Sequence, residues 1–209
     1  MTDALIVVDL QNDFLPGGAL AVAGGDAVIP TVNDLIARAP CVVMTQDWHP
    51  RDHVSFAANH PGHALYETIS VPSGSQVLWP VHCVQGTAGA EISPLIDTKK
   101  ACAIVRKGIR PDVDSYSGFV DADRRTRSGL AGLLRERGVT RVFVCGLATD
   151  FCVSWTALDA AGAGFETFVV TDASRAIDVN GSLAAARDAW RDAAIKEIQS
   201  SEIAFVLKN

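Results

Sequence analysis

Five short apolar runs alternate with longer segments of helical periodicity, and this alternation constrains the fold more than any other feature of the chain. The runs lie at Leu5–Asp9, Cys41–Thr45, Cys102–Arg106, Arg141–Cys145 and Glu166–Thr171, with a sixth candidate within Lys196–Ser200. The helical patterns lie at Asp26–Ala37, Ser128–Arg137, Asp150–Ala161 and Gly181–Ala193. Strands that alternate with helices pair in parallel through right-handed crossovers. We therefore expect an α/β fold with three α/β/α layers around a mostly parallel central sheet.

Length and composition favour one domain over residues 1–209. A chain of 209 residues with 48% hydrophobic content can bury one sizeable core. The net charge of −6 argues against nucleic acid as a partner. No apolar run is long enough to span a bilayer and no leader pattern precedes the first strand, so we expect no membrane partner. The five cysteines show no pairing pattern, which favours a reducing compartment, with the cytoplasm as the expectation.

Cys152 is the residue that points most directly to chemistry. It follows the apolar run in VFVCGLATDFC (residues 142–152) and begins a helical pattern. The N–H groups at the N-terminus of a helix lower the pKa of a thiol there, and the thiolate is the reactive form. Most cysteines are inert, so a structural role remains the alternative for Cys152 taken alone. We expect its neighbours Phe151 and Trp155 to pack in the core.

Two other strand ends supply the partners that a nucleophilic thiol needs. Asp9 ends the first apolar run, and a carboxylate between Val8 and Leu10 needs a partner if it is buried. Lys107 ends the third run and precedes a glycine, which fits a long cationic side chain that reaches into a cleft. A turn cap and a solvated charge are the alternatives. Together the carboxylate could take the thiol proton while the ammonium favours the thiolate.

A fourth cluster has the residue types of a metal site. Asp47, His49 and His53 lie in QDWHPRDH, where Pro50 predicts a loop, and His82 lies further along the chain. Mixed carboxylate and imidazole ligands suit Zn²⁺, Fe²⁺ or Mn²⁺. The spacing by itself leaves a chance cluster of surface polar residues open.

Six motifs then occur in order along nearly the whole chain. They are VDLQNDF (Val8–Phe14), QDWHPRDHVSF (Gln46–Phe56), WPVHCVQGTAGAE (Trp79–Glu91), RKG (Arg106–Gly108), VDSYSGF (Val113–Phe119) and CGLATDFCV (Cys145–Val153). With these motifs the chain resembles the nicotinamidases of the isochorismatase-like cysteine hydrolase superfamily. The resemblance thins after about Asn180, and it implies a Rossmann-like hydrolase fold.

The resemblance implies a role for each candidate residue. It implies a catalytic triad of Asp9, Lys107 and Cys152, and metal ligands at Asp47, His49 and His82, with His53 a fourth that ligates in some members. It places the substrate against Phe14, Trp79, Tyr116 and Leu147. It also implies a cis Leu147–Ala148 peptide bond, with an oxyanion hole made by the N–H groups of Ala148 and Cys152.

The expected activity is that of a metal-dependent amidohydrolase. It would convert nicotinamide, and also pyrazinamide, to nicotinate and ammonia through a thioester on Cys152, in NAD salvage. One divalent ion, Zn²⁺ before Fe²⁺ or Mn²⁺, would bind the ring nitrogen. The small-molecule substrate is the expected partner, and a homo-oligomer stays open.

Three other functions are weighed against this activity. Another small amide or ureido substrate stays open. An isochorismatase activity is disfavoured because those enzymes lack the nucleophilic cysteine. A non-catalytic metal- or redox-binding protein using Cys83, Cys152 and the histidines is disfavoured because it has no need for Asp9 and Lys107.

Overall fold

Six parallel strands form the central sheet of this computed structural model, which describes residues 2–206. The strands are β1 (Thr2–Val8), β2 (Val42–Asp47), β5 (Ala101–Lys107), β6 (Val139–Leu147), β7 (Glu166–Arg175) and β8 (Lys196–Ile198). They lie in the order β5–β2–β1–β6–β7–β8, and each neighbouring pair is parallel. From β1 the chain adds β2 and then β5 on one side, and it then returns to add β6 on the other side of β1. This reversal point is where open α/β sheets bind their ligands.

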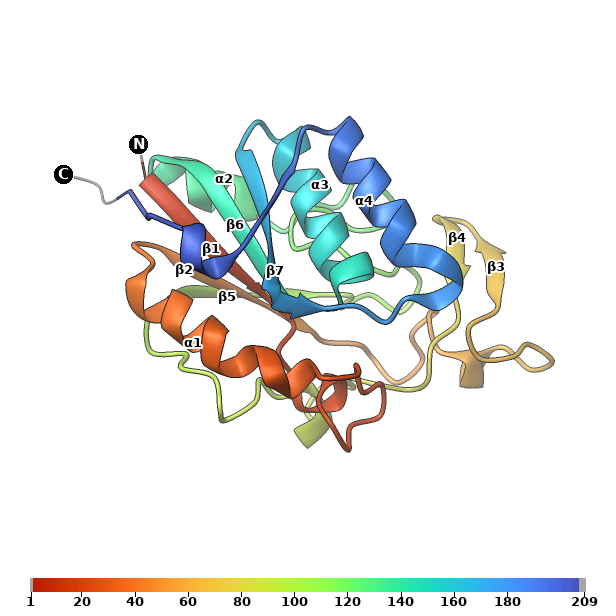
Figure 1. Cartoon of the computed structure of the whole chain (residues 1–209). Coiled ribbons are helices and arrows are strands. Elements are labelled where there is room, and N and C mark those ends of the chain that lie inside the picture. The colour runs from red at the N-terminus through yellow and green to blue at the C-terminus, as the bar shows by residue number, and fades with distance from the viewer. Residues whose placement is uncertain (1, 207–209) are drawn as a thin grey trace.

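Helices cover both faces of this sheet, as Figure 1 shows. Helix α1 (Ile29–Arg38) packs on one face, and α2 (Leu130–Glu136), α3 (Ser154–Gly162) and α4 (Ser182–Asp192) pack on the other. The buried strand β1 serves both cores, since Leu5 and Val7 belong to one apolar cluster and Ile6 and Val8 to the other. The expected three-layer α/β/α fold is therefore confirmed.

The predicted helices are present with shifted starts. The pattern from Asp26 divides into a 3₁₀ turn (Gly25–Val28) and α1, whose first turn contains Pro30. Proline is tolerated there because the first N–H groups of a helix have no partner within it. The pattern that contains Cys152 begins as a π-type turn (Thr149–Val153) before α3. The sixth strand, β8, is present in the predicted place.

A hairpin lies where the sequence indicated only loop. Strands β3 (Thr68–Val71) and β4 (Gly74–Val77) pair antiparallel as a separate two-stranded sheet, at the right-hand edge of Figure 1. Each strand has four residues and most of their side chains are exposed, so no buried alternation marked them in the sequence. Two-stranded sheets are marginal on their own. This one relies on contacts with the body of the protein, such as the hydrogen bond of 2.7 Å from Gln76 to Asp114.

The carboxyl ends of four neighbouring strands bring the candidate residues to one edge of the sheet. Asp9 follows β1, Asp47 ends β2, Lys107 ends β5, and Cys152 follows β6. Asp47 and Lys107 are partners in the register of β2 and β5. Among residues 2–206, no helix has both the length and the apolar composition needed to cross a bilayer.

Candidate active site

Cys152 lies in the turn that connects β6 to α3, close to the reversal point of the sheet. The thiol is nearly buried, with 6% of the residue exposed. The Leu147–Ala148 peptide bond that precedes the turn is cis, as the resemblance implies. Lys107 Nζ lies 3.2 Å from Cys152 Sγ. The turn therefore points the thiol inward, toward the ends of β1, β2 and β5.

The Lys107 ammonium is the centre of this group. It donates hydrogen bonds to Asp47 Oδ1 at 2.5 Å, to the Ser115 carbonyl oxygen at 3.1 Å and to Cys152 Sγ. It also lies 2.8 Å from Asp9 Oδ2. Burial lowers the pKa of Lys107, but the carboxylates of Asp47 and Asp9 outweigh it and hold this pKa well above its usual value. Lys107 is thus a permanent cation between two carboxylates and a thiol.

The two carboxylate oxygens of Asp9 have different partners. Thr45 donates its hydroxyl proton to Oδ1 at 2.6 Å. The other oxygen, Oδ2, is buried and forms the ion pair with Lys107, without a well-aligned hydrogen bond from residues 2–206. A carboxylate oxygen of Asp9 and the Cys152 sulfur lie within 4.8 Å of each other. Burial raises the pKa of Asp9 while Lys107 opposes that rise, which suits a carboxylate that takes up a proton.

The expectation of a lowered pKa for Cys152 is wrong for this state of the protein. Burial raises the pKa of the thiol well above its usual value, and although Lys107 opposes this, the charges of Asp9 and Asp47 add to it. The start of a helix lowers a thiol pKa most effectively where solvent also reaches the sulfur. Almost no solvent reaches Cys152 in this structure. Because its pKa is raised, Cys152 needs an adjacent base to react.

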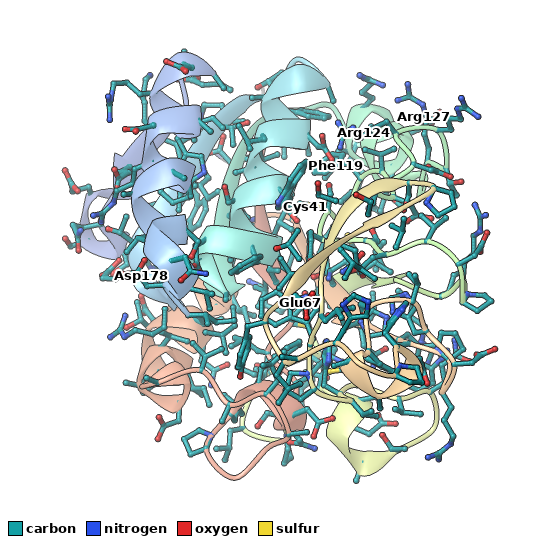
Figure 2. All side chains as sticks on the ribbon, turned by 90° about the vertical axis from the view of Figure 1, so that its right-hand side faces the viewer. Cys41, Glu67, Phe119, Arg124, Arg127 and Asp178 are labelled. Carbon is teal, nitrogen blue, oxygen red and sulfur yellow. The ribbon has the colours of Figure 1, made fainter. Side chains whose placement is uncertain are left out.

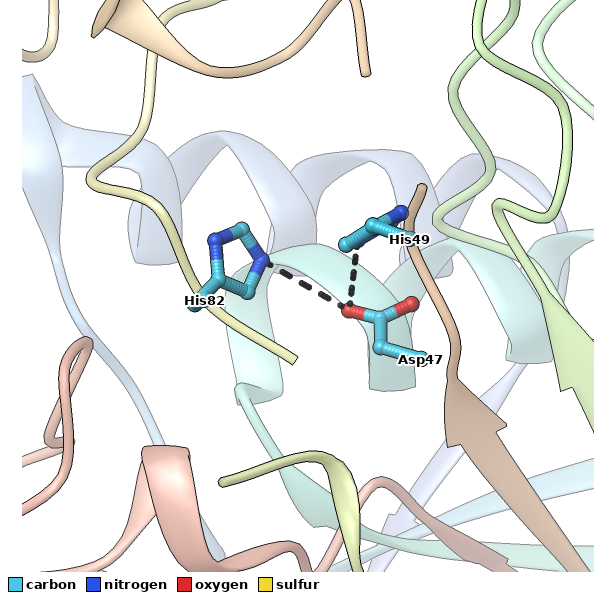
Figure 3. A group of neighbouring side chains, drawn as sticks. All are labelled: Asp47, His49 and His82. Carbon is cyan, nitrogen blue, oxygen red and sulfur yellow. Dashed lines mark ion pairs between the residues drawn. The ribbon is translucent and has the colours of Figure 1, made fainter. Parts of the chain in front are cut away.

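Asp47, His49 and His82 form the second half of the site, shown in Figure 3. Asp47 Oδ2 lies 3.5 Å from His49 Nε2 and 3.9 Å from His82 Nε2. In both histidines Nδ1 lies against a backbone carbonyl, that of Gly108 at 2.9 Å and that of Pro80 at 2.8 Å. A carbonyl oxygen can only accept a hydrogen bond, so Nδ1 carries a proton in both rings and both Nε2 atoms face Asp47. Burial lowers the pKa of His49, but the charge of Asp47 outweighs it and raises this pKa.

This donor set fits a divalent metal ion. One donor atom from each of Asp47, His49 and His82 lies within 4.8 Å of the others, and all three residues are buried. Burial lowers the pKa of His82 to about 4, so its imidazole is neutral, as a ligand must be. Two nitrogen donors and one carboxylate oxygen suit Zn²⁺, and also Fe²⁺ or Mn²⁺.

His53 lies beside this set but differs from it. Its ring stacks on that of His49, with centroids 4.1 Å apart. Its Nδ1 lies 2.7 Å from the Ser55 hydroxyl and 3.3 Å from the Ser55 N–H. Nε2 lies 4.0 Å from Asp114 Oδ1, and it has no hydrogen-bond partner among the residues that the structure describes. His53 therefore forms a group with His49 and Asp114, and it lies outside the group formed by Asp47, His49 and His82.

The candidate substrate residues belong to one apolar cluster. Trp79 donates its indole N–H to the Tyr116 hydroxyl at 2.8 Å, and Phe14 lies 5.5 Å from the His82 ring, so these aromatic side chains border the site. Leu147 is fully buried in the same cluster as Phe14 and Trp79, and a Cβ added to Gly25 would lie 3.1 Å from it.

Three supporting residues were not singled out from the sequence. Gln11 holds the Asp47 backbone on both sides: it accepts the Asp47 N–H at 2.7 Å and donates to the Asp47 carbonyl at 2.8 Å. Thr45 and Asp114 contact Asp9 and His53 as described above. Gln11 and Asp114 fall inside the motifs VDLQNDF and VDSYSGF, which were the signal that could have identified them.

The comparisons with known proteins agree with this geometry. The family model described as the isochorismatase domain matches residues 3–204. A nicotinamidase of Acinetobacter baylyi is 54% identical over 196 residues, which cover 94% of this chain and 90% of that protein. A solved nicotinamidase/pyrazinamidase from Acinetobacter baumannii has a TM-score of 0.95 at 53% identity, with 96% of this chain and 97% of that chain covered.

A third relative was solved with a metal. The pyrazinamidase of Pyrococcus horikoshii, in complex with zinc, has a TM-score of 0.78 at 40% identity, with 95% of this chain and 99% of that chain covered. The resemblance drawn from the six motifs is thereby confirmed. The chain that places Asp9, Lys107 and Cys152 together at the reversal point of its sheet belongs to the isochorismatase family.

Proposed function

We propose that this protein hydrolyses nicotinamide to nicotinate and ammonia, with Asp9, Lys107 and Cys152 as the catalytic residues. The observation that carries the proposal is the position of Lys107 Nζ, 2.8 Å from Asp9 Oδ2 and 3.2 Å from Cys152 Sγ. This arrangement supplies a base, a fixed positive charge and a nucleophile within one buried group. Relatives named nicotinamidase and nicotinamidase/pyrazinamidase support the choice of substrate.

The reaction would proceed by acyl transfer through Cys152. Asp9 takes the thiol proton, and the thiolate attacks the carboxamide carbon. The N–H groups of Ala148 and Cys152, on either side of the turn, are the proposed donors to the oxyanion. When the C–N bond breaks, Asp9 returns the proton to the leaving nitrogen as ammonia. Asp9 then deprotonates a water molecule that cleaves the thioester, which releases nicotinate and restores the thiol.

Lys107 would make the proton transfer feasible in a buried site. Its charge stabilises the thiolate, which would otherwise be too costly beside two carboxylates. It also holds Asp9 near the sulfur. The Ser115 carbonyl and Asp47 fix the ammonium in place.

Asp47, His49 and His82 would hold one divalent ion, with Zn²⁺ proposed before Fe²⁺ or Mn²⁺, and His53 would support the set from beside His49. The ion, when bound, supplies a Lewis acid that anchors the ring nitrogen of the substrate. The aromatic side chains of Phe14, Trp79 and Tyr116 would hold the ring. Pyrazinamide also has a ring nitrogen, so the proposal includes it as a substrate.

Nicotinate is a precursor that a salvage route to NAD would consume, and we propose that role for the reaction. The five cysteines are all free in the structure, which supports a reducing compartment such as the cytoplasm.

Ammonia release by the purified protein tests the proposal. Nicotinamide and pyrazinamide should both yield ammonia, and nicotinate should appear in equal amount. Benzamide, which has the carboxamide but no ring nitrogen, is the matched control and should be a poor substrate. Equal turnover of benzamide and nicotinamide would contradict the anchoring of the ring nitrogen. Ammonia release only from another small amide would redirect the substrate assignment.

A further inference from the structure

A cavity of about 310 Å³ lies on the outer side of Tyr116, between the β3–β4 hairpin and α3. Tyr116, Trp155, Gln76, Ser73 and Ser75 are among the residues that line it. Figure 2 views the molecule from this side, with the hairpin in front and Arg124 near its upper end. The cavity combines aromatic walls with serine hydroxyls, and Arg124 also lines it.

Trp155 is the prominent side chain of this cavity. It was expected in the core, but 43% of it is exposed. It lines the cavity between α3 and the hairpin. Its ring lies 6.4 Å from that of Tyr116, at an interplanar angle of 34°. The Arg124 guanidinium lies 5.9 Å from the ring centroid and is ion-paired with Asp159 on the same helix. The tryptophan is therefore held in place but open to a ligand.

Tyr116 separates this cavity from the reactive group. Its ring lies 5.7 Å from that of Phe151, the neighbour of Cys152, and its hydroxyl accepts the Trp79 indole N–H. The preceding residue, Ser115, accepts a hydrogen bond from Lys107 through its carbonyl oxygen. Tyr116 in the wall of the cavity and its neighbour Ser115 thus connect the cavity to the Lys107 ammonium.

The inner site is closed in this structure, so a substrate has to pass side chains on its way in. Cys152 is 6% exposed, and Asp9, Lys107 and Trp79 are all buried. The hairpin beside Tyr116 is a separate two-stranded sheet. Gln76 of that hairpin donates hydrogen bonds to Asp114 at 2.7 Å and to the Tyr116 hydroxyl at 3.2 Å. For Tyr116 to move aside, its hydrogen bonds with Gln76 and Trp79 and its packing against Phe151 have to break.

We infer that the Trp155 cavity is an outer binding subsite for a neutral, planar aromatic amide, which stacks there before it passes Tyr116. Trp155 and Tyr116 offer aromatic faces to the ring, and the hydroxyls of Ser73 and Ser75 offer partners to a carboxamide. The charge of Arg124 is already matched by Asp159, so the cavity favours a neutral ligand over an anion. The identity of the ligand as nicotinamide rests on the proposed function; the subsite itself does not.

Steady-state kinetics with nicotinamide test the subsite. Trp155→Ala should lower kcat/KM roughly fivefold with kcat unchanged, because one lost aromatic stack weakens capture but not the later chemistry. Trp155→Phe, which keeps an aromatic face, should restore most of kcat/KM. Leu95→Ala, a change at a residue that is 64% exposed and lies outside the lining of this cavity, should have no effect. An unchanged kcat/KM in Trp155→Ala, or an equal loss in Trp155→Phe or Leu95→Ala, would overturn the inference.

Binding of benzamide to Cys152→Ala protein separates the subsite from the proposed reaction. Benzamide has no ring nitrogen, so its affinity for the outer cavity should not depend on a metal, and ligand-observed NMR should detect it with and without a chelator. Adding Trp155→Ala should weaken this binding roughly fivefold. If wild-type protein releases no ammonia from nicotinamide, the proposed function fails while this measurement still reports on the cavity. Binding unaffected by Trp155→Ala, or a change of oligomeric state in that variant by sedimentation, would show instead that the cavity is not a subsite.

Discussion

Lys107 Nζ lies 2.5 Å from Oδ1 of Asp47, and the second oxygen of the same carboxylate faces His49 and His82. One buried side chain thus joins the ammonium beside the thiol to the candidate metal ligands. Electrostatic changes on either side should therefore affect the other.

Cys152→Ala should abolish hydrolysis while the protein stays folded, since the thiol forms the covalent bond to substrate and the substitution removes only one sulfur atom. Cys102→Ala is the matched control, because Cys102 is exposed and should tolerate the change. Ammonia release and thermal unfolding measure the two outcomes. Residual turnover above about 1% of wild type in Cys152→Ala would remove the thiol from its assigned role.

Asp9→Asn should lower kcat by roughly 10²- to 10⁴-fold, because the amide keeps the shape of the carboxylate but takes no proton from the thiol. The loss should not add to that of Cys152→Ala, since the two residues act in one step. Thr45→Val, which removes the hydrogen bond to Asp9 Oδ1, should have a much smaller effect. A kcat for Asp9→Asn close to that of Thr45→Val would rule out Asp9 as the base.

Lys107→Met should cost roughly 3–5 kcal/mol of unfolding free energy, in addition to activity, because it leaves the buried Asp9 and Asp47 carboxylates without a counter-charge. Urea denaturation measures the loss. Lys196→Met is the control: this lysine is paired with Glu166 but exposed, so its loss should be below about 1 kcal/mol. The double variant Lys107→Met with Asp47→Asn should regain part of the stability. No regain would mean that the charges of Lys107 and Asp47 are not coupled.

His82→Asn should reduce bound metal well below one equivalent per chain and raise KM for nicotinamide, because it removes one of the two Nε2 donors that face Asp47. His63→Asn, at a histidine near the surface, should leave metal content unchanged. Elemental analysis of dialysed protein gives the stoichiometry. Fully active wild-type protein that contains no bound divalent metal would refute the metal assignment.

His53→Gln should keep close to one equivalent of metal, because His53 groups with His49 and Asp114 and lies outside the group formed by Asp47, His49 and His82. A weaker affinity is expected, since the stacked ring also fixes His49. Metal titration with a competing chelator compares this variant with His82→Asn. An equal loss of metal in the two variants would make His53 a direct ligand.

Much of the fold was predictable because it depends on local periodicity. Apolar runs with β-branched residues, separated by helical patterns, predicted each strand of the central sheet and each helix to within a few residues. The β3–β4 hairpin escaped prediction because its short strands are mostly exposed and its stability comes from contacts such as that of Gln76 with Asp114. Trp155 was misplaced for a related reason, since periodicity alone does not show which side of a short helix meets a hairpin distant in sequence.

The sequence by itself determined which chemical groups are present and that they follow strand ends: a carboxylate at Asp9, an ammonium at Lys107, a thiol at Cys152 and imidazoles near Asp47. Only the tertiary structure decided how these groups interact. The order β5–β2–β1–β6 brings them into one buried volume, where burial raises the pKa of Cys152 against the expected effect of a helix start. The physical reason is that desolvation and Coulomb interactions depend on distances between residues far apart in the chain, and no local pattern encodes those distances.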